Sequence, residues 1–199
     1  MLPVSSEPVA LGLPLEADRL VLRDYREDDL ESLHSLWSDS DVAKFIPPKG
    51  PRKEEDTKRL LLKALATQLE RPRRYFRLAI VLKPDGEFVG DCVCRVHDPD
   101  NKEDLTHLLG EAYIGFFLHR RFWGQGYATE IARTLLRFGF EELGLHRIFA
   151  WCDRENVASS RVLEKAGMKQ EGHFRESVLL GDEWRDPLVY GIIRDETKV

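Results

Sequence analysis

Hydrophobic positions in the first third of the chain recur with two different periods. Leu20, Val21 and Leu22 form a short apolar run that is typical of a strand. Residues 27–38 and 54–70 instead repeat apolar side chains three and four positions apart, which is the spacing of a helix with one buried face. Prolines and a glycine in residues 47–51 interrupt the pattern between them. The sequence therefore predicts a strand followed by two amphipathic helices.

The pattern then changes to alternation, which is typical of strands. Residues 75–82 and 88–96 are joined by a turn at residues 84–86, so they predict a hairpin. Residues 112–118 form the most apolar strand candidate, which places them at the centre of a sheet. The remaining predicted elements are a helix that follows the glycines at 124 and 126 and ends near 144, a strand at 147–152, a helix at 156–166, and a closing hairpin of 172–180 and 184–194.

The same pattern predicts the domain organisation. Residues 1–14 contain three prolines and no periodicity, which indicates a loose N-terminal arm. Residues 15–194 are long enough to bury one core, so we expect a single domain there, with residues 195–199 as a short C-terminal tail.

Composition and charge exclude several classes of protein. Hydrophobic residues make up 42% of the 199 positions and charged residues 33%, as in ordinary globular chains. No apolar run is long enough for a membrane-spanning helix, and the N-terminus lacks the pattern of a secretion signal. The three cysteines have neither the spacing of a disulfide framework nor that of a metal or redox pair. We therefore expect a cytoplasmic protein with no membrane partner.

The charge distribution bears on nucleic acids. A net charge of −5 argues against a nucleic-acid partner, because duplex phosphates favour a basic face. Two local basic clusters remain, residues 71–74 and Arg120 with Arg121, and each is either a phosphate contact or a solvated surface.

A glycine loop between a strand and a helix is the strongest chemical signal. Trp123–Ala128 reads W-G-Q-G-Y-A, and its backbone N–H groups lie at the positive end of the helix that follows. The loop has neither the lysine of a P-loop nor the third glycine of a dinucleotide fingerprint. It is therefore either a site for another pyrophosphate or a tight turn without a ligand.

Separate motifs that occur in order make the signal more specific. Ile114–His119 and Phe122–Glu130 are followed by Asn156, Ser159 and the segment 162–175. Together these residues resemble the GNAT superfamily of N-acetyltransferases, and most closely its RimJ/RimL-like branch, over residues 15–194.

The resemblance implies an α/β fold and a cofactor site. The expected GNAT fold has a mixed, mostly antiparallel curved sheet of about seven strands, flanked by about four helices, with a splayed central strand pair. Acetyl-CoA, the co-substrate, would lie in that gap. The corresponding residues of this chain are Phe116, Phe117, Leu118, Trp123, Gly124, Gln125, Gly126, Tyr127, Ala128, Thr129 and Asn156. Main-chain groups near 116–118 would bind pantetheine or a developing oxyanion, and those of 124–129 would bind the pyrophosphate. Trp123 departs from the Gln or Arg of many members, and Arg120 or Arg121 is a candidate to supply the missing charge.

The resemblance also shows which familiar catalysts are missing. The glutamate base of some members is replaced by Ala112, and the tyrosine acid of many is replaced by Leu163. Ser159 is the candidate partner of the leaving thiolate, although a serine at this place also satisfies local backbone. Glu111 and Tyr113 are candidates to relay the proton of the amine. His97, Asp98, Asp104 and His107 have no zinc spacing, so we expect no metal.

The acceptor is the least determined part of the reaction. The RimJ/RimL-like resemblance favours the N-terminal α-amine of a protein, while a small amine such as an aminoglycoside, a polyamine or an amino acid derivative stays open. A non-catalytic acyl-CoA sensor is a further alternative because both familiar catalysts are absent. Trp37, Phe45, Trp184 and Tyr190 are candidates to line the acceptor pocket, and a homodimer is possible on the pattern of the superfamily.

Overall fold

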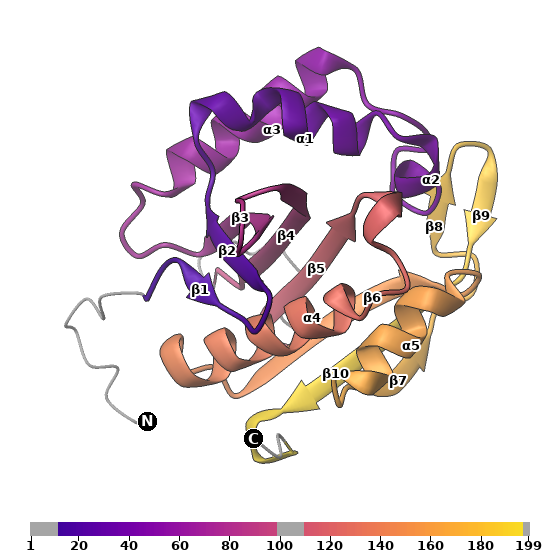
Figure 1. Ribbon diagram of the computed structural model, residues 1–199. Coiled ribbons are helices and arrows are strands. Elements are labelled where there is room, and N and C mark those ends of the chain that lie inside the picture. The colour runs from indigo at the N-terminus through magenta and orange to yellow at the C-terminus, as the bar shows by residue number, and fades with distance from the viewer. Residues whose placement is uncertain (1–11, 99–109, 197–199) are drawn as a thin grey trace.

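One sheet of eight strands runs through the centre of the molecule (Figure 1). The computed structural model describes residues 12–98 and 110–196. The strands follow the order β1-β2-β3-β4-β5-β6-β10-β7. They are β1 (Leu15–Glu16), β2 (Leu20–Asp24), β3 (Tyr75–Leu82), β4 (Phe88–Val96), β5 (Ala112–Leu118), β6 (Arg147–Asp153), β10 (Pro187–Ile193) and β7 (Lys169–His173). Neighbours are antiparallel except for β5 and β6, which confirms the expected mixed, mostly antiparallel sheet.

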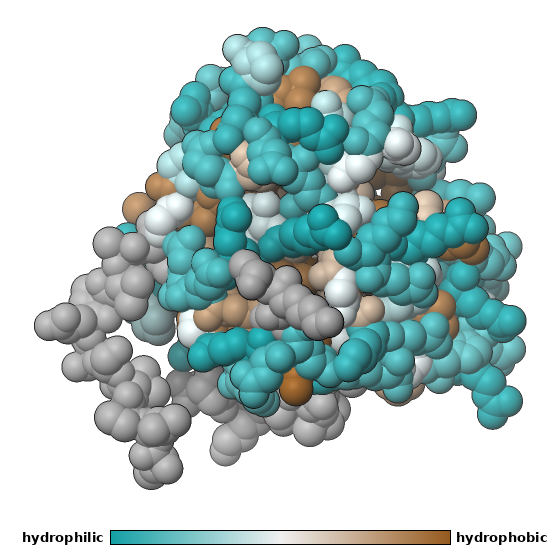
Figure 2. Space-filling model, turned by 60° about the horizontal axis from the view of Figure 1, so that its bottom comes forward, coloured by the Kyte–Doolittle hydropathy of each residue, from teal (hydrophilic) through white to brown (hydrophobic). Residues whose placement is uncertain are grey.

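Helices cover both faces of this sheet. Figure 1 shows α1 (Leu30–Trp37) and α3 (Glu54–Thr67) on one face, and α4 (Tyr127–Arg137) and α5 (Val157–Lys165) on the other. The helix α4 continues as a π-helical turn over Phe138–Glu142. The surface on the α4 and α5 side is mainly hydrophilic, with small, separate hydrophobic patches (Figure 2). The fold is therefore an α/β sandwich of three layers, with apolar cores above and below the sheet.

Alternation along the strands supplies both cores. In β3, Phe76, Leu78 and Ile80 are fully buried in the core toward α4, while Ala79 belongs to the core toward α1 and α3. The ring of Phe76 packs edge-on against Phe138 at a centroid distance of 5.1 Å. Because both faces of the sheet are covered by helices, even the second face of this strand is buried.

The structure adds elements that the pattern did not predict. A short helix, α2 (Ser40–Ala43), follows α1, and a separate hairpin is formed by β8 (Val178–Leu180) and β9 (Glu183–Arg185). The closing hairpin was predicted as one unit, but β7 pairs with β10, and β8 pairs only with β9. The reason is a buried network: Asp153 accepts two hydrogen bonds from Arg185, which holds the small hairpin against the end of β6.

The outer segments only partly lie within the described residues. Gly12 donates from its backbone N–H to Glu142 Oε2 at 2.8 Å, so the last part of the predicted arm is attached to the domain. A short 3-10 turn spans Arg194–Glu196 at the other end. Residues 1–11 and 197–199, which complete the predicted arm and tail, lie outside the described residues.

A buried carboxylate connects the sheet to α1. Asp91 on β4 is fully buried and accepts hydrogen bonds from the Tyr25 hydroxyl at 2.9 Å, from Trp37 Nε1 at 3.2 Å and from both Nε and Nη2 of Arg77. Burial raises the pKa of Asp91, and the Arg77 cation opposes that shift. Burial and the charge of Asp91 also raise the pKa of Tyr25, which keeps its hydroxyl protonated and donating.

This network predicts a large effect on stability. We expect Asp91→Ala to lower the free energy of unfolding by about 3–5 kcal/mol, because Arg77 would remain as a buried charge without its partner. Chemical denaturation measures this difference. The double variant Arg77→Met, Asp91→Leu is expected to recover part of the loss, since no buried charge remains. A loss below about 1 kcal/mol in Asp91→Ala would contradict this account of the pair.

Candidate active site

The two central strands separate soon after they meet. β5 and β6 pair only at Ala112 with Ile148 and at Tyr113 with Phe149. All seven residues of β5 pair with β4 on its outer side, and all seven of β6 pair with β10. Each strand therefore follows its own outer neighbour. From Ile114 onward, the edge of β5 that faces β6 has no strand partner within the described residues, so its backbone groups are available to an extended ligand.

The glycine loop lies at the wide end of this gap. Gly126 precedes α4 with φ of 84°, a left-handed conformation that favours glycine. Within the described residues, the N–H groups of Gly124 to Ala128 donate to no backbone or side-chain acceptor, whereas Thr129 N donates to Gly126 O at 3.1 Å. A side chain at Gly124 would meet nothing within 4 Å, so the space in front of the loop is open. Free N–H groups at a helix N-terminus fit the pyrophosphate of acetyl-CoA.

Arg19 supports the loop from behind, and the sequence did not predict this role. Its guanidinium forms an ion pair with Glu130 at 2.8 Å and donates to the carbonyl oxygen of Gln125 at 3.0 Å. It also lies over the ring of Tyr127, 4.2 Å from the ring centre. Arg19 is 111 positions from Glu130, so no local pattern relates the two residues. The loop conformation is therefore fixed by a cation from the N-terminal part of the chain.

The other side chains of the loop also have structural contacts. Trp123 donates from Nε1 to the carbonyl oxygen of Leu118 at 2.8 Å, and Gln125 donates to Arg121 O at 2.7 Å. Leu118, predicted to bind pantetheine through its main chain, thus has its carbonyl oxygen occupied by the indole. Phe116, its neighbour on the same face of β5, packs against the core toward α4.

Several arginines of the two basic clusters pair with carboxylates. Arg120 forms an ion pair with Asp41 at 2.6 Å, and Arg121 forms one with Glu87 at 2.8 Å. Both side chains are largely exposed, at 72% and 61%, so their role as a substitute for the charge that Trp123 lacks stays a prediction. In the second cluster, Arg73 forms an ion pair with Asp24 at 2.7 Å.

Asn156 and Ser159 begin α5 on the other side of the gap. Asn156 Oδ1 accepts from the backbone N–H of Ser159 at 3.1 Å, so the asparagine is the N-cap of the helix. Burial raises the pKa of the Cys152 thiol, while hydrogen bonds from Ser160 and Ser159 lower it. The Ser159 hydroxyl therefore lies beside the end of β6, where the strands are apart.

The two relay candidates lie in different environments. Glu111 precedes β5, and its carboxylate accepts from the backbone N–H groups of His146 and Arg147, the latter at 3.3 Å. It thereby holds the start of β6 rather than facing the open part of the gap. Tyr113 lies among aromatic side chains instead. The centre of its ring is 5.6 Å from that of Phe149 and 6.4 Å from that of Trp151. Burial raises the pKa of Tyr113 to about 12, so its hydroxyl is a donor at neutral pH.

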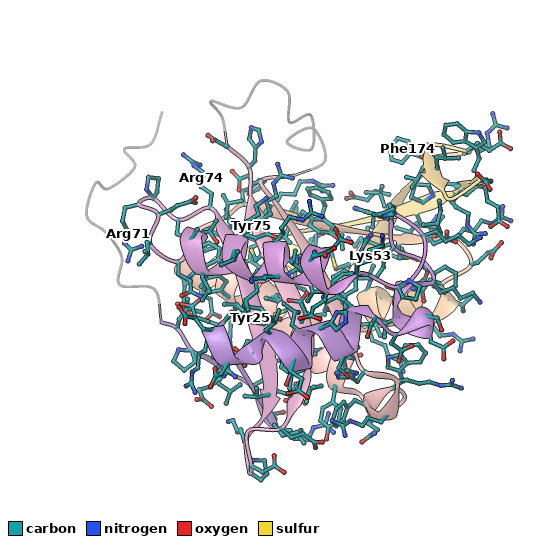
Figure 3. All side chains as sticks on the ribbon, turned by 90° about the horizontal axis from the view of Figure 1, so that it is seen from above. Tyr25, Lys53, Arg71, Arg74, Tyr75 and Phe174 are labelled. Carbon is teal, nitrogen blue, oxygen red and sulfur yellow. The ribbon has the colours of Figure 1, made fainter. Side chains whose placement is uncertain are left out.

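A cavity of about 520 Å³ opens between β5 and the helices α1 and α3. Its aromatic lining includes Trp37, Tyr75, Tyr113 and Phe117, and the rings of Trp37 and Phe117 are 4.8 Å apart. Figure 3 views the molecule from this side, with Tyr75 beside α3, Lys53 at the start of that helix, and Arg71 and Arg74 beyond its other end. Because Tyr113 and Phe117 belong to both the cavity and the splayed strand, an acceptor in the cavity would reach the gap.

The other pocket candidates lie elsewhere. Phe45 lines a much smaller cavity beside Trp151 and the β8–β9 hairpin. Trp184 is 59% exposed at the end of that hairpin, and Tyr190 is buried in the core, where its hydroxyl contacts Glu164. Trp37 is thus the member of the predicted set that lines the large cavity.

The described residues contain no group of three or more His, Cys, Asp or Glu side chains able to hold a metal ion. Asp104 and His107, two of the four candidates in the charged loop, lie outside the described residues. No helix within residues 12–98 or 110–196 has the length and apolar character needed to cross a bilayer.

Comparison with known proteins identifies the class. The sequence pattern of the acetyltransferase (GNAT) domain matches residues 19–169. The uncharacterized N-acetyltransferase YnaD of Bacillus subtilis (strain 168) is 32% identical over 178 residues, which cover 89% of this chain and 95% of that protein. The chain belongs to the GNAT family of acetyltransferases. It is accordingly an N-acetyltransferase that uses acetyl-CoA as co-substrate.

Two solved structures share the fold. RimJ of Mycobacterium smegmatis, in complex with a CoA disulfide, has a TM-score of 0.74 at 24% identity, covering 90% of this chain and 84% of that one. Spermidine N-acetyltransferase of Vibrio cholerae, in complex with CoA and spermine, has a TM-score of 0.73 at 17% identity, covering 89% and 97%. At these identities the likeness concerns the fold alone.

The loop geometry leads to a prediction about cofactor affinity. Gly126 already has a left-handed backbone, and with a Cβ that conformation would cost about 1–2 kcal/mol. We therefore expect Gly126→Ala to raise the Kd for coenzyme A roughly tenfold by calorimetry. Gly86→Ala is the matched control, because Gly86 has φ of 73° in the β3–β4 turn, away from the gap. Wild-type affinity in Gly126→Ala would show that this backbone conformation is not required for binding.

Proposed function

We propose that this enzyme transfers acetyl from acetyl-CoA to the N-terminal α-amine of a protein. The observation that carries the proposal is the composition of the large cavity. Its lining contains one carboxylate, Asp56, beside three arginines and four aromatic rings. A polyamine carries several positive charges and would need several carboxylates, whereas a peptide N-terminus presents one amine and a neutral backbone.

The residues of this chain contribute mainly by positioning. Acetyl-CoA supplies a thioester, and the amine nitrogen forms a bond to its acyl carbon while the carbon–sulfur bond breaks. The N–H groups of Gly124 to Ala128 would hold the pyrophosphate, and the free edge of β5 near Phe117 would hold the acyl arm. Ser159 is the proposed hydrogen-bond donor to the departing thiolate, and Asn156 fixes that serine through the helix cap.

In this proposal the hydroxyl group of Tyr113 is a neutral hydrogen-bond donor. Its hydroxyl stays protonated at neutral pH because burial raises its pKa, so it is unable to act as the base that removes the proton of the amine. The amine must then lose its proton to solvent, either before or during the attack. We also place the reaction in the cytoplasm, in keeping with three cysteines that are all free thiols.

The proposal is tested by following free thiol release from acetyl-CoA. Two acceptor panels are compared: peptides that differ in their first residues, and small amines that include spermidine and an aminoglycoside. We expect turnover of peptides, with kcat/KM well above that of any small amine. Turnover of the small amines alone would contradict the proposed acceptor. Tight binding of acetyl-CoA without turnover of either panel would favour a sensor.

The high pKa of Tyr113 leads to a prediction about pH dependence. We expect Tyr113→Phe to lower kcat roughly fivefold, the effect of one hydrogen bond worth about 1 kcal/mol. Because the hydroxyl is protonated below its pKa of about 12, no limb of the pH profile between about pH 6 and 10 should disappear. Tyr75→Phe is the control, since this phenol also lines the cavity and accepts from Arg77 at 3.2 Å. Loss of a limb only in Tyr113→Phe would show that Tyr113 titrates as a base.

A further inference from the structure

The lining of the acceptor cavity contains more arginines than carboxylates. Arg52, Arg77 and Arg95 are part of its lining, against the single carboxylate of Asp56. The charge of Arg77 is balanced, because its guanidinium forms an ion pair with the buried carboxylate of Asp91. Burial alone would lower the pKa of Arg77, but the carboxylate of Asp91 raises it. Arg77 is therefore already neutralised inside the protein, and the question of a ligand concerns Arg52.

Arg52 has a different environment. It lies between the loop after α2 and the start of α3, and it donates from Nη2 to the carbonyl oxygen of Pro47 at 2.6 Å. Within the described residues it forms no ion pair with a carboxylate. Burial lowers the pKa of Arg52, although the charge of Asp56 opposes this shift. The guanidinium has five N–H donors, so several remain for a partner that enters the cavity.

Two aromatic contacts place this cation near the reaction. The Arg52 guanidinium lies over Trp37, 5.8 Å from the ring centre, and Trp37 in turn contacts Phe117 on the splayed strand β5. An extended peptide advances about 3.3–3.6 Å per residue. A chain whose amine lies in the gap beside Phe117 would thus carry its second or third side chain past Arg52.

We infer that Arg52 binds a carboxylate of the acceptor, and that the enzyme selects N-termini with Asp or Glu at the second or third position. The inference rests on the proposed function, whose acceptor it specifies. A planar guanidinium accepts a carboxylate through two parallel hydrogen bonds, and partial burial strengthens that interaction. The ring of Trp37 holds the Arg52 guanidinium in place, and the outer edge of the guanidinium stays available to the carboxylate.

The test compares peptides that are identical except for Glu, Gln or Lys at the second position, with a parallel set at the third. We expect kcat/KM for the Glu peptide to exceed that for the Gln peptide at least tenfold at one of these positions, and the Lys peptide to be poorer still. Arg52→Gln should bring the Glu and Gln peptides to the same kcat/KM. Arg52→Glu should reverse the order, so that the Lys peptide becomes the best substrate.

A control arginine distinguishes recognition from a general effect of charge. Arg71 lies beyond the far end of α3 and donates only to backbone oxygens of Gln68 and Glu70 within the described residues (Figure 3). Arg71→Gln removes the same charge and should keep the wild-type preference for Glu. Binding of peptides labelled at their C-terminus, measured by fluorescence anisotropy with coenzyme A present, gives the same comparison without turnover.

The outcomes separate this inference from the proposed function. Equal kcat/KM for Glu, Gln and Lys peptides in the wild type would overturn the role of Arg52 and leave the function standing. If peptides fail but a small amine with a carboxylate is acetylated and this activity is lost in Arg52→Gln, the role of Arg52 is supported and the protein acceptor is wrong. Acetylation of spermidine but not of any acidic acceptor would overturn both.

Discussion

The separation of β5 from β6 is the constraint on which the rest of the site depends. Two pairs of residues join the strands, and beyond Tyr113 and Phe149 each strand continues with its outer neighbour. A sheet normally pairs both edges of an internal strand, whereas within the described residues the inner edge of β5 has no strand partner beyond Tyr113. The helices α4 and α5 begin on either side of this edge. The first turn of α4 places backbone N–H groups there, and the first turn of α5 places Ser159 there. The gap is tolerated because β5 pairs fully with β4 and β6 pairs fully with β10. This outer pairing stabilises the two strands although they pair with each other at only two positions.

The pleat of β5 gives the strand two faces with different surroundings. Phe116 and Leu118 face the core toward α4, whereas Tyr113 and Phe117 face the cavity toward α1 and α3. The backbone between them forms the boundary at which an acyl group and an amine would meet. The buried carboxylate of Asp91 holds the cavity side together, because it fixes both Trp37 and Arg77. If the acceptor binds in this cavity as proposed, its recognition is coupled to a polar network that also stabilises the fold.

The sequence was most informative where the chemistry is local. The strand, glycine loop and helix at 112–137, and the Asn156 cap of α5, follow from patterns within a few positions, and the structure forms them there. Contacts between distant segments were not predictable in this way. Periodicity gave no reason to pair Arg19 with Glu130, Asp153 with Arg185, or Glu111 with the start of β6. Trp184 and Tyr190 were candidates for the acceptor pocket, while their actual exposure depends on how the last strands pair.

The contacts of Arg19 limit how this protein can be divided into fragments that keep the glycine loop in its conformation. The residues that would contact phosphate form a contiguous segment, but the conformation of that segment is held by a guanidinium from the beginning of the domain. A fragment that starts after β2 would retain every residue of the glycine motif and lack the cation that shapes it. For the same reason, the motif is not a portable module: grafted onto another scaffold, it would need a substitute for this brace before its N–H groups pointed in a common direction.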